Sequence, residues 1–402
     1  MRKIKHIANT TVTQVSVNPR GAKCCQYTYL VQIIDMENII QAKKLINDSK
    51  NVSVFVPNNS ELDALSSAFS LCYALNNQGK NVVCLPQIRN LPEKYFSFFP
   101  GELIPKDFVI SIKGKEVSEL YYEKQNEALK IYLTLKDGKI EKEDIHFNSL
   151  RRTNEQDSDL FITIGIEQLE RIGSFYEKNF KAFWQTPIIN IDNHISNNKF
   201  GNVNLVEPNV PLCVILKKFF CAGGGNISDA RIRTWLLAGI IEYSRKNNAT
   251  EAFLENIFEL ILSSVEYKKI INFFSPEQKS INNDLFCEIF KRLRLLENKK
   301  ISYAFLSREV FLQTQSTPRD LGNVLKHLIE NLLPLPAFVL FWESSALCGT
   351  KGLFYSEKED LTHGFYNRFG GEKKEKTIIF SVPENRLELA GKEVLNKMGA
   401  VS

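Results

Sequence analysis

The segment Pro187-Ile188-Ile189-Asn190-Ile191-Asp192-Asn193-His194 joins an apolar run directly to an acid, an amide and a histidine. A short, mostly apolar run bounded by polar residues predicts a buried β-strand. Asn197 and a second short apolar run over residues 204–206 follow it. The sequence therefore predicts a strand whose carboxyl end leads straight into chemically active side chains.

The pattern upstream of this segment predicts a β-α-β unit. Residues 52–56 form a short apolar run, residues 62–77 predict a helix that ends at Gly79, and residues 81–85 predict the next strand. A further strand over residues 159–165 precedes a helix around residues 167–176. These alternating elements predict a parallel sheet with a ligand crevice at the carboxyl end of its first strand.

Periodicity divides the chain into four parts. Residues 1–35 have weak periodicity and predict an amino-terminal extension, and residues 36–280 predict the α/β domain. Alternating residues over about 107–147 predict a β-hairpin insertion with its turn at Lys136–Lys139. Residues 249–297 look entirely helical, residues 281–298 predict a connecting helix, and residues 299–402 predict a small α+β domain.

The composition is that of a globular protein. Of 402 residues, 44% are hydrophobic and 24% are charged, and the net charge of +5 is too mild to indicate a duplex-binding protein. Eight cysteines and five histidines lack zinc-site spacing, which predicts reduced thiols in a cytoplasmic protein. The sequence has no run of about 18 apolar residues, so we expect no membrane span. No apolar segment follows the basic Met1–Lys5, so we do not expect secretion.

Four motif sets together resemble the DHH phosphoesterases, in particular the oligoribonuclease and pAp-phosphatase branch. They are Glu61-Leu62-Asp63, the run from Leu160 to Arg171, Asp192-Asn193-His194, and the run from Leu237 to Ser244. The resemblance covers about residues 38–270 in motif order and spacing, and the carboxyl-terminal domain more loosely. It implies a DHH-type parallel α/β domain and a site where two metal ions activate a hydroxide that attacks phosphorus.

The chain departs from this family at most of the metal-ligand positions that the resemblance implies. Asp63, Asp192 and His194 match, whereas Glu61 is a longer substitute and Asn193 replaces the central histidine. The positions of the family's first histidine, bridging aspartate and last aspartate fall on Pro57, Gly165 and Tyr243. Glycine offers no side-chain ligand, and the bridging carboxylate organises both metals. We therefore expect no bridged metal pair.

The acids that remain have a second interpretation. At a helix amino terminus, Asp63 and Glu61 can either ligate a metal ion or cap the helix. Asn193 can bind a metal only through its carbonyl oxygen, and in the alternative that we favour, Asp192, Asn193 and His194 hydrogen-bond among themselves and to the neighbouring loop.

The carboxyl-terminal domain carries basic residues near a glycine pair. Phe369-Gly370-Gly371 is followed by Glu372-Lys373-Lys374 and resembles the family's substrate-binding segment without its histidine. Candidate phosphate contacts are Arg368, Lys373, Lys374 and Lys376. An exposed, solvated charge run is the alternative.

Three functional hypotheses follow. In the first, the chain has lost two-metal hydrolysis and binds a nucleotide or short single-stranded RNA in the cleft between its domains, with no cofactor or one weakly held divalent ion. In the second, it is an active Mn²⁺- or Mg²⁺-dependent phosphoesterase of short oligoribonucleotides or 3′-phosphorylated nucleotides. In this second hypothesis, Asp192 and His194 are catalytic. Asp192, His194, Asp63 and Glu61 bind the metal, and Asn193 contacts the substrate. In the third, the chain is a scaffold whose cleft is filled by Pro57, Phe55 and Tyr243.

Overall fold

The protein is described by a computed structural model that covers ten stretches of the chain. They are residues 36–57, 60–85, 93–99, 109–114, 116–125, 128–148, 158–275, 282–296, 301–344 and 349–399. The extension expected over residues 1–35 lies outside the described residues. Among the residues that are described, no helix combines the length and the apolar character that a membrane crossing needs.

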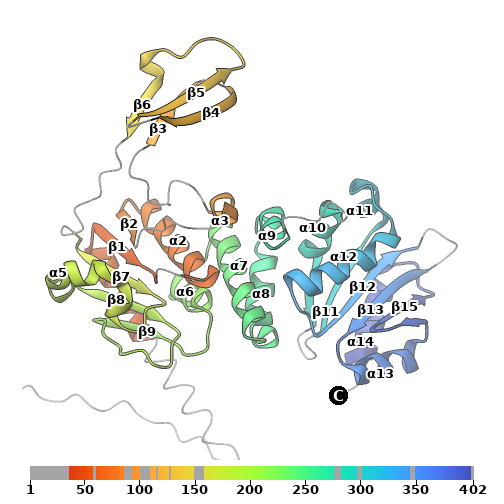
Figure 1. Ribbon diagram of the computed structural model, residues 1–402. Coiled ribbons are helices and arrows are strands. Elements are labelled where there is room, and N and C mark those ends of the chain that lie inside the picture. Colours follow the sequence, from red (N-terminus) through yellow and green to blue (C-terminus); the bar gives the residue numbers. More distant parts are fainter. Residues whose placement is uncertain are drawn as a thin grey trace, which may run out of the picture.

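A five-stranded parallel sheet forms the centre of the first domain (Figure 1). Its order is β2-β1-β7-β8-β9. The strands are β1 (Asn51–Phe55), β2 (Asn81–Leu85), β7 (Leu160–Ile164), β8 (Ile188–Asp192) and β9 (Val203–Val206). The chain leaves β1 toward β2 and returns on the other side of β1 as β7. The order of the strands therefore reverses beside β1, which is where open α/β sheets bind ligands. The predicted parallel sheet is confirmed.

Helices cover both faces of this sheet, since its central strands are buried on both sides. One face packs against the segment over residues 36–48 and against α2 (Leu62–Asn77) and α6 (Leu212–Cys221), and α7 (Ala230–Lys246) packs in turn on α2 and α6. The other face carries an aromatic cluster under α4 (Ser174–Lys178) and α5 (Phe180–Gln185). The helix over residues 62–77 has its predicted bounds. The helix predicted around residues 167–176 is instead η3 (Leu169–Ile172) followed by α4, because Gly173 at φ 74° interrupts it.

The insertion consists of two separate two-stranded antiparallel sheets, which Figure 1 shows apart from the five-stranded sheet. β3 (Val109–Ile112) pairs with β6 (Ile145–Asn148), and β4 (Val117–Gln125) pairs with β5 (Ala128–Leu135). The predicted turn at Lys136–Lys139 is therefore wrong: these residues lead from β5 through η1 (Lys142–Asp144) to β6. The chain between β4 and β5 is shorter, so that hairpin closes at a lower entropic cost.

A row of helices joins the two domains. After α7 come α8 (Thr250–Leu262), α9 (Tyr267–Phe274) and α10 (Asn283–Arg292), while α3 (Glu93–Phe98) packs near α9. The stretch over residues 249–297 is not entirely helical, because β10 (Arg294–Leu296) adds an antiparallel edge strand to the second sheet. The main apolar core continues from the first domain through these helices into one face of that sheet.

The carboxyl-terminal domain is a six-stranded mixed sheet with helices, which confirms the expected α+β pattern. Its order is β10-β11-β12-β13-β15-β14. The further strands are β11 (Ile301–Leu306), β12 (Ala337–Glu343), β13 (Thr350–Ser356), β14 (Glu372–Lys374) and β15 (Thr377–Val382). The helices are α11 (Arg308–Gln313), η5 (Pro318–Asp320), α12 (Leu321–His327), η6 (Leu328–Leu332), α13 (Glu359–Phe369) and α14 (Leu387–Gly399).

Candidate functional site

A pocket of about 850 Å³ opens beyond the carboxyl ends of β1, β7 and β8. Its lining residues all belong to the first domain. They are Pro57, Ser60, Glu61, Asp63, Ala64, Gly165, Glu167, Arg171, Asn193, His194, Ile195, Ser196, Asn209, Leu212, Tyr243 and Asn247. The pocket thus lies where the strand order predicts, but in one domain and not between the two, because the residues after the strand ends supply its walls.

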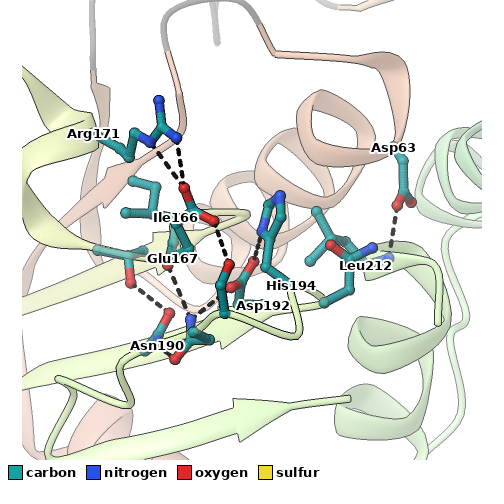
Figure 2. Close-up of polar contacts among 12 residues, drawn as sticks. Asp63, Ile166, Glu167, Arg171, Asn190, Asp192, His194 and Leu212 are labelled. Atoms are coloured by element: carbon teal, nitrogen blue, oxygen red, sulfur yellow. Dashed lines mark hydrogen bonds and ion pairs between the residues drawn. The ribbon is translucent and has the colours of Figure 1, made fainter. Parts of the chain in front are cut away.

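Asp63 lies at the floor of the pocket and caps a helix other than its own. Its carboxylate accepts hydrogen bonds from the backbone N–H of Leu212 at 2.7 Å and of Cys213 at 2.9 Å, at the start of α6 (Figure 2). The side chain comes from the first turn of α2 and is 3% exposed. Both carboxylate oxygens satisfy amides that a helix amino terminus leaves without intrahelical partners. Asp63 therefore joins α2 to α6.

The environment of Asp63 also changes its titration. Burial raises the pKa of its carboxyl group to about 7, although the hydrogen bonds from Leu212 and Cys213 act in the opposite direction. The nearby negative charge of Glu242 raises this pKa further. Desolvation exceeds the stabilisation by two backbone donors, as it does for carboxylates removed from water without a cation. Asp63 is therefore partly protonated at neutral pH.

Asp192 ends β8 and holds the following loop. One oxygen lies 2.7 Å from Nδ1 of His194, and the other accepts a hydrogen bond at 2.6 Å from Nδ2 of Asn197. Asp192 is fully buried, whereas the side chain of His194 is 47% exposed and lines the pocket. Figure 2 shows these contacts apart from those of Asp63. Asp192 and His194 thus contact each other, and Asp192 also binds the neighbouring loop, as in the hydrogen-bonding alternative of the sequence analysis.

Amide side chains extend this network below the pocket. Asn197 also donates to the carbonyl of Ile166 and accepts from Nδ2 of Asn190, which accepts in turn from Thr163. Asn193 donates through Nδ2 to the carbonyl of Val210 at 2.9 Å, so its amide closes a loop contact. Buried polar groups need such partners because each unpaired group costs about 1–3 kcal/mol. The network fixes the loop that carries His194.

Gly165 occupies the place of the expected bridging aspartate, and its backbone and surroundings disfavour a larger residue. Its φ of 69° lies in the left-handed region. A Cβ added there would lie 3.1 Å from Cδ1 of Leu212 and 3.6 Å from Cβ of Ala64. The backbone and the apolar contacts both favour glycine at this position. The start of α6 therefore contacts the position that the Cβ of a bridging aspartate would take.

Glu61 and Tyr243 lie at the opposite wall. Glu61 precedes α2 without forming a side-chain cap bond, and it pairs with Lys246, whose Nζ lies 3.1 Å from Glu61 and 3.3 Å from Glu242. Tyr243 lines the pocket and packs edge-to-face on Phe253 at 6.1 Å between ring centroids. The carboxylates on this wall therefore face an ammonium group.

Sequence reasoning missed the polar rim that follows Gly165. Glu167 accepts hydrogen bonds from Nε of Arg171 at 2.9 Å and from Oγ of Ser196 at 2.7 Å. These bonds lower the pKa of Glu167. Arg171 remains 68% exposed and can offer further donors to a ligand. Their position directly after a predicted strand end was the available signal, since that edge of a parallel sheet carries the site.

The residues of this pocket do not fit a two-metal centre. Both oxygens of Asp63 and both oxygens of Asp192 are occupied by protein donors, and Gly165 supplies no ligand. Within the described stretches, no group of three or more His, Cys, Asp or Glu side chains is arranged to hold a metal ion. A bridged pair needs several free oxygen or nitrogen ligands around two ions about 4 Å apart.

The other predicted site residues lie elsewhere. Arg368 donates to the backbone carbonyl of Lys397, Lys373 lies 3.4 Å from Nδ1 of His363, and Lys374 belongs to β14. None of them lines the pocket. Phe55 does not fill the pocket either: it packs on Phe161 at 5.2 Å between ring centroids, on the opposite face of the sheet. β1 ends at Phe55, and Pro57 lies beyond the strand in the loop that lines the pocket.

Comparisons with known proteins give structural matches alone. No protein-family model matches the sequence, and no curated protein does. An exopolyphosphatase-related protein from Bacteroides fragilis is 12% identical, with 90% of this chain and 96% of that chain covered and a TM-score of 0.43. RecJ from Thermus thermophilus in complex with Mn²⁺ is 11% identical, with 92% and 55% covered and a TM-score of 0.30.

A third similar structure is the DHH domain of a member of a ribosomal-protein family, at 10% identity. The match covers 92% of this chain and 91% of that chain, with a TM-score of 0.28. The similarity is distant, and neither the ligand nor the chemistry of the pocket follows from it.

Proposed function

We propose that this DHH-like chain binds a nucleotide, or the end of a short single-stranded oligonucleotide, and that its pocket has lost two-metal hydrolysis. The observation that carries the proposal is that the pocket is open while the ligand positions around it are used by the protein itself. Asp63 caps α6, Asp192 holds the following loop, and Leu212 fills the space beside Gly165.

The size and lining of the pocket support a small organic anion. Ligand pockets commonly enclose about 300–1,000 Å³, and this one encloses about 850 Å³. Ile195, Leu212 and Tyr243 supply apolar surface for a base, and Ile195 is 78% exposed at the rim. An unfilled pocket with both apolar and polar walls favours a ligand over the scaffold hypothesis, in which side chains fill the space.

Arg171 and His194 are the groups we assign to the phosphate. Arg171 uses part of its guanidinium on Glu167 and keeps further N–H donors exposed. Nδ1 of His194 is held by Asp192, so Nε2 is the ring nitrogen left to face a ligand. The acids Glu61 and Glu167 already have cationic partners, and a phosphate therefore does not meet two unpaired carboxylates.

Isothermal titration calorimetry with AMP, with a three-nucleotide RNA and with MnCl₂ alone tests the proposal. We expect the full chain to bind AMP without metal, and His194→Ala or Arg171→Ala to weaken AMP binding at least about tenfold, since each removes a charge-assisted or ring donor. His363→Ala is the matched control, because this exposed histidine lies outside the pocket lining. We expect no release of nucleotide from the RNA.

Two outcomes contradict the proposal. Tight binding of two Mn²⁺ ions that is lost in Asp192→Ala, together with RNA hydrolysis, would establish the active phosphoesterase. Absence of AMP and RNA binding in a folded protein would leave a scaffold.

A further inference from the structure

A row of three aromatic side chains runs along α4 and α5; its first member is half-buried against the inner cluster, and its last two members are exposed. Tyr176, Phe180 and Trp184 follow one another at intervals of four residues, with ring centroids 6.1 Å and 5.9 Å apart. Phe180 is 49% exposed and Trp184 is 76% exposed. The inner side of the same helices already packs Phe183 and Phe175 into the aromatic cluster under the sheet. Folding therefore does not account for the exposure of Phe180 and Trp184.

Basic side chains accompany this row. Lys178 and Lys181 are exposed on the same two helices. Neither has an ion-pair partner among the residues that the structure describes. Glu177 is the acid within residues 174–185, so this stretch carries two cations against one anion. Lysine is depleted in protein–protein interfaces, whereas aromatic rings flanked by lysines suit nucleic acid.

The row begins beside the pocket. Arg171, on the pocket rim, belongs to η3, and α4 starts three residues later at Ser174. The chain then continues through α4 into α5, which Figure 1 shows at the edge of the first domain. A strand whose end lies in the pocket can therefore continue over these rings.

From this placement we propose that the outer face of α4 and α5 binds single-stranded nucleic acid, with bases stacked on Trp184 and Phe180 and phosphates near Lys178 and Lys181. The proposal deepens the proposed function, because it makes the ligand of the pocket the end of a strand and not a free nucleotide alone. Stacking on aromatic faces tolerates any base, so we expect little sequence preference.

The chain contains a built-in reporter for this contact. Of its three tryptophans, Trp235 is 0% exposed and Trp342 is 5% exposed, whereas Trp184 is 76% exposed. Emission from solvent-exposed indole, and its change on stacking, therefore comes mainly from Trp184. A ten-nucleotide oligouridine is a suitable probe, and AMP is its single-nucleotide counterpart.

The experiment combines tryptophan quenching with the anisotropy of labelled oligouridine at low salt, on the full chain. We expect oligouridine to quench the emission and AMP to leave it unchanged. We expect Trp184→Ala to weaken oligouridine binding about tenfold, and Trp184→Phe to keep most of the affinity. Leu312→Ala is the matched control, because Leu312 is also exposed, at 70%, but lies on α11. Residue 184 is exposed, and circular dichroism verifies that the variants fold.

The outcomes separate this proposal from the proposed function. Quenching and the Trp184 effect without AMP binding would support the aromatic row and reject the pocket as a nucleotide site. AMP binding with unquenched emission and an unchanged oligouridine affinity in Trp184→Ala would overturn the row and leave the pocket. The proposal for the row would also be overturned if Trp184→Ala changed the sedimentation of the protein but not its affinity for oligouridine. That result would identify the row as a protein contact.

Discussion

Asp63 and Asp192 reach the same region from α2 and β8, and the chain uses these two buried carboxylates differently. Asp63 binds two backbone amides of another helix, and its burial raises the pKa of its carboxyl group to about 7. Asp192 binds two side chains of its own loop, one of them the half-exposed ring of His194.

Asp63 thus holds two helices together, whereas Asp192 holds a residue that lines the pocket. Removing Asp63 leaves backbone donors buried at a helix start, which affects the packing of α2 on α6. Removing Asp192 releases side chains that can turn toward water, and its main effect falls on the position of His194. A retained acid in a metal-ligand motif can therefore persist for a reason that involves no metal.

Adding a third carboxylate, at Gly165 in the pocket that Asp63 also lines, should have the largest effect on the free energy of unfolding. We expect Gly165→Asp to lower the free energy of unfolding by about 3 kcal/mol, because it combines a positive φ with contact on Leu212 and Ala64. Urea unfolding measures this. The control is Gly79→Asp, at φ 80° with open space around it, which should cost only about 1 kcal/mol. Equal costs at the two glycines would mean that the space beside Gly165 is free.

Removing the carboxylate of Asp63 should have the next largest effect on stability. We expect Asp63→Ala to lower the free energy of unfolding by about 2 kcal/mol, because two buried amides at the start of α6 lose their acceptor. Glu61→Ala, two residues away and without a cap bond, should cost less than about 0.5 kcal/mol in the same urea titration. If both variants were equally stable, Asp63 would not join the two helices.

The pH dependence of stability should report on the buried carboxyl group of Asp63. The folded-state pKa of Asp63, about 7, lies above the ordinary value of 3.8. Between these values the folded state binds the extra proton, so this group's contribution to stability falls as pH rises from about 4 to about 7. We expect the stability advantage of the parent over Asp63→Asn to shrink by an amount on the order of a few kcal/mol over that window. Urea unfolding at four pH values measures it, and a constant difference would contradict the raised pKa.

Removing Asp192 should have a smaller effect on stability and a larger one on the loop. We expect Asp192→Ala to cost about 1 kcal/mol, because His194 can turn to water and Asn197 keeps its bond to the carbonyl of Ile166. Amide hydrogen exchange should increase over residues 193–201, while AMP binding weakens. Unchanged exchange in that loop would show that Asp192 does not position it.

The exposed pairs on the wall of the pocket should contribute least. We expect Lys246→Met to change the free energy of unfolding by less than about 0.5 kcal/mol, since Lys246 and Glu61 are 45% and 61% exposed. Calorimetry with MnCl₂ should show no tight site in this variant, because Asp63 stays bound to α6. The appearance of one would mean that Lys246 occupies the position of a metal ion.

Local patterns predicted much of the first domain. The bounds of α2 and β2 agree with the apolar periodicity and with Gly79 after the helix, because these signals act within a few residues. The prediction that a hairpin turns at Lys136–Lys139 failed for two reasons. The run before β5 also forms a strand, β4, which pairs with β5. The partner of β6 is β3, which lies more than thirty residues away along the chain. Glu167 and Arg171 lie within the motif run from Leu160 to Arg171, but they were missed because that run was considered only for the metal ligand expected at residue 165.

The sequence by itself determined the parallel order of elements, the strand that ends in Asp192, and the edge of the sheet where a pocket forms. Each of these follows from side-chain period and chain direction, which are local properties. The tertiary structure alone decided that Asp63 caps α6, that Leu212 fills the space at Gly165, and that the pocket lies within one domain. These depend on which backbone groups meet across about 150 residues of chain, and packing sets such contacts, not periodicity.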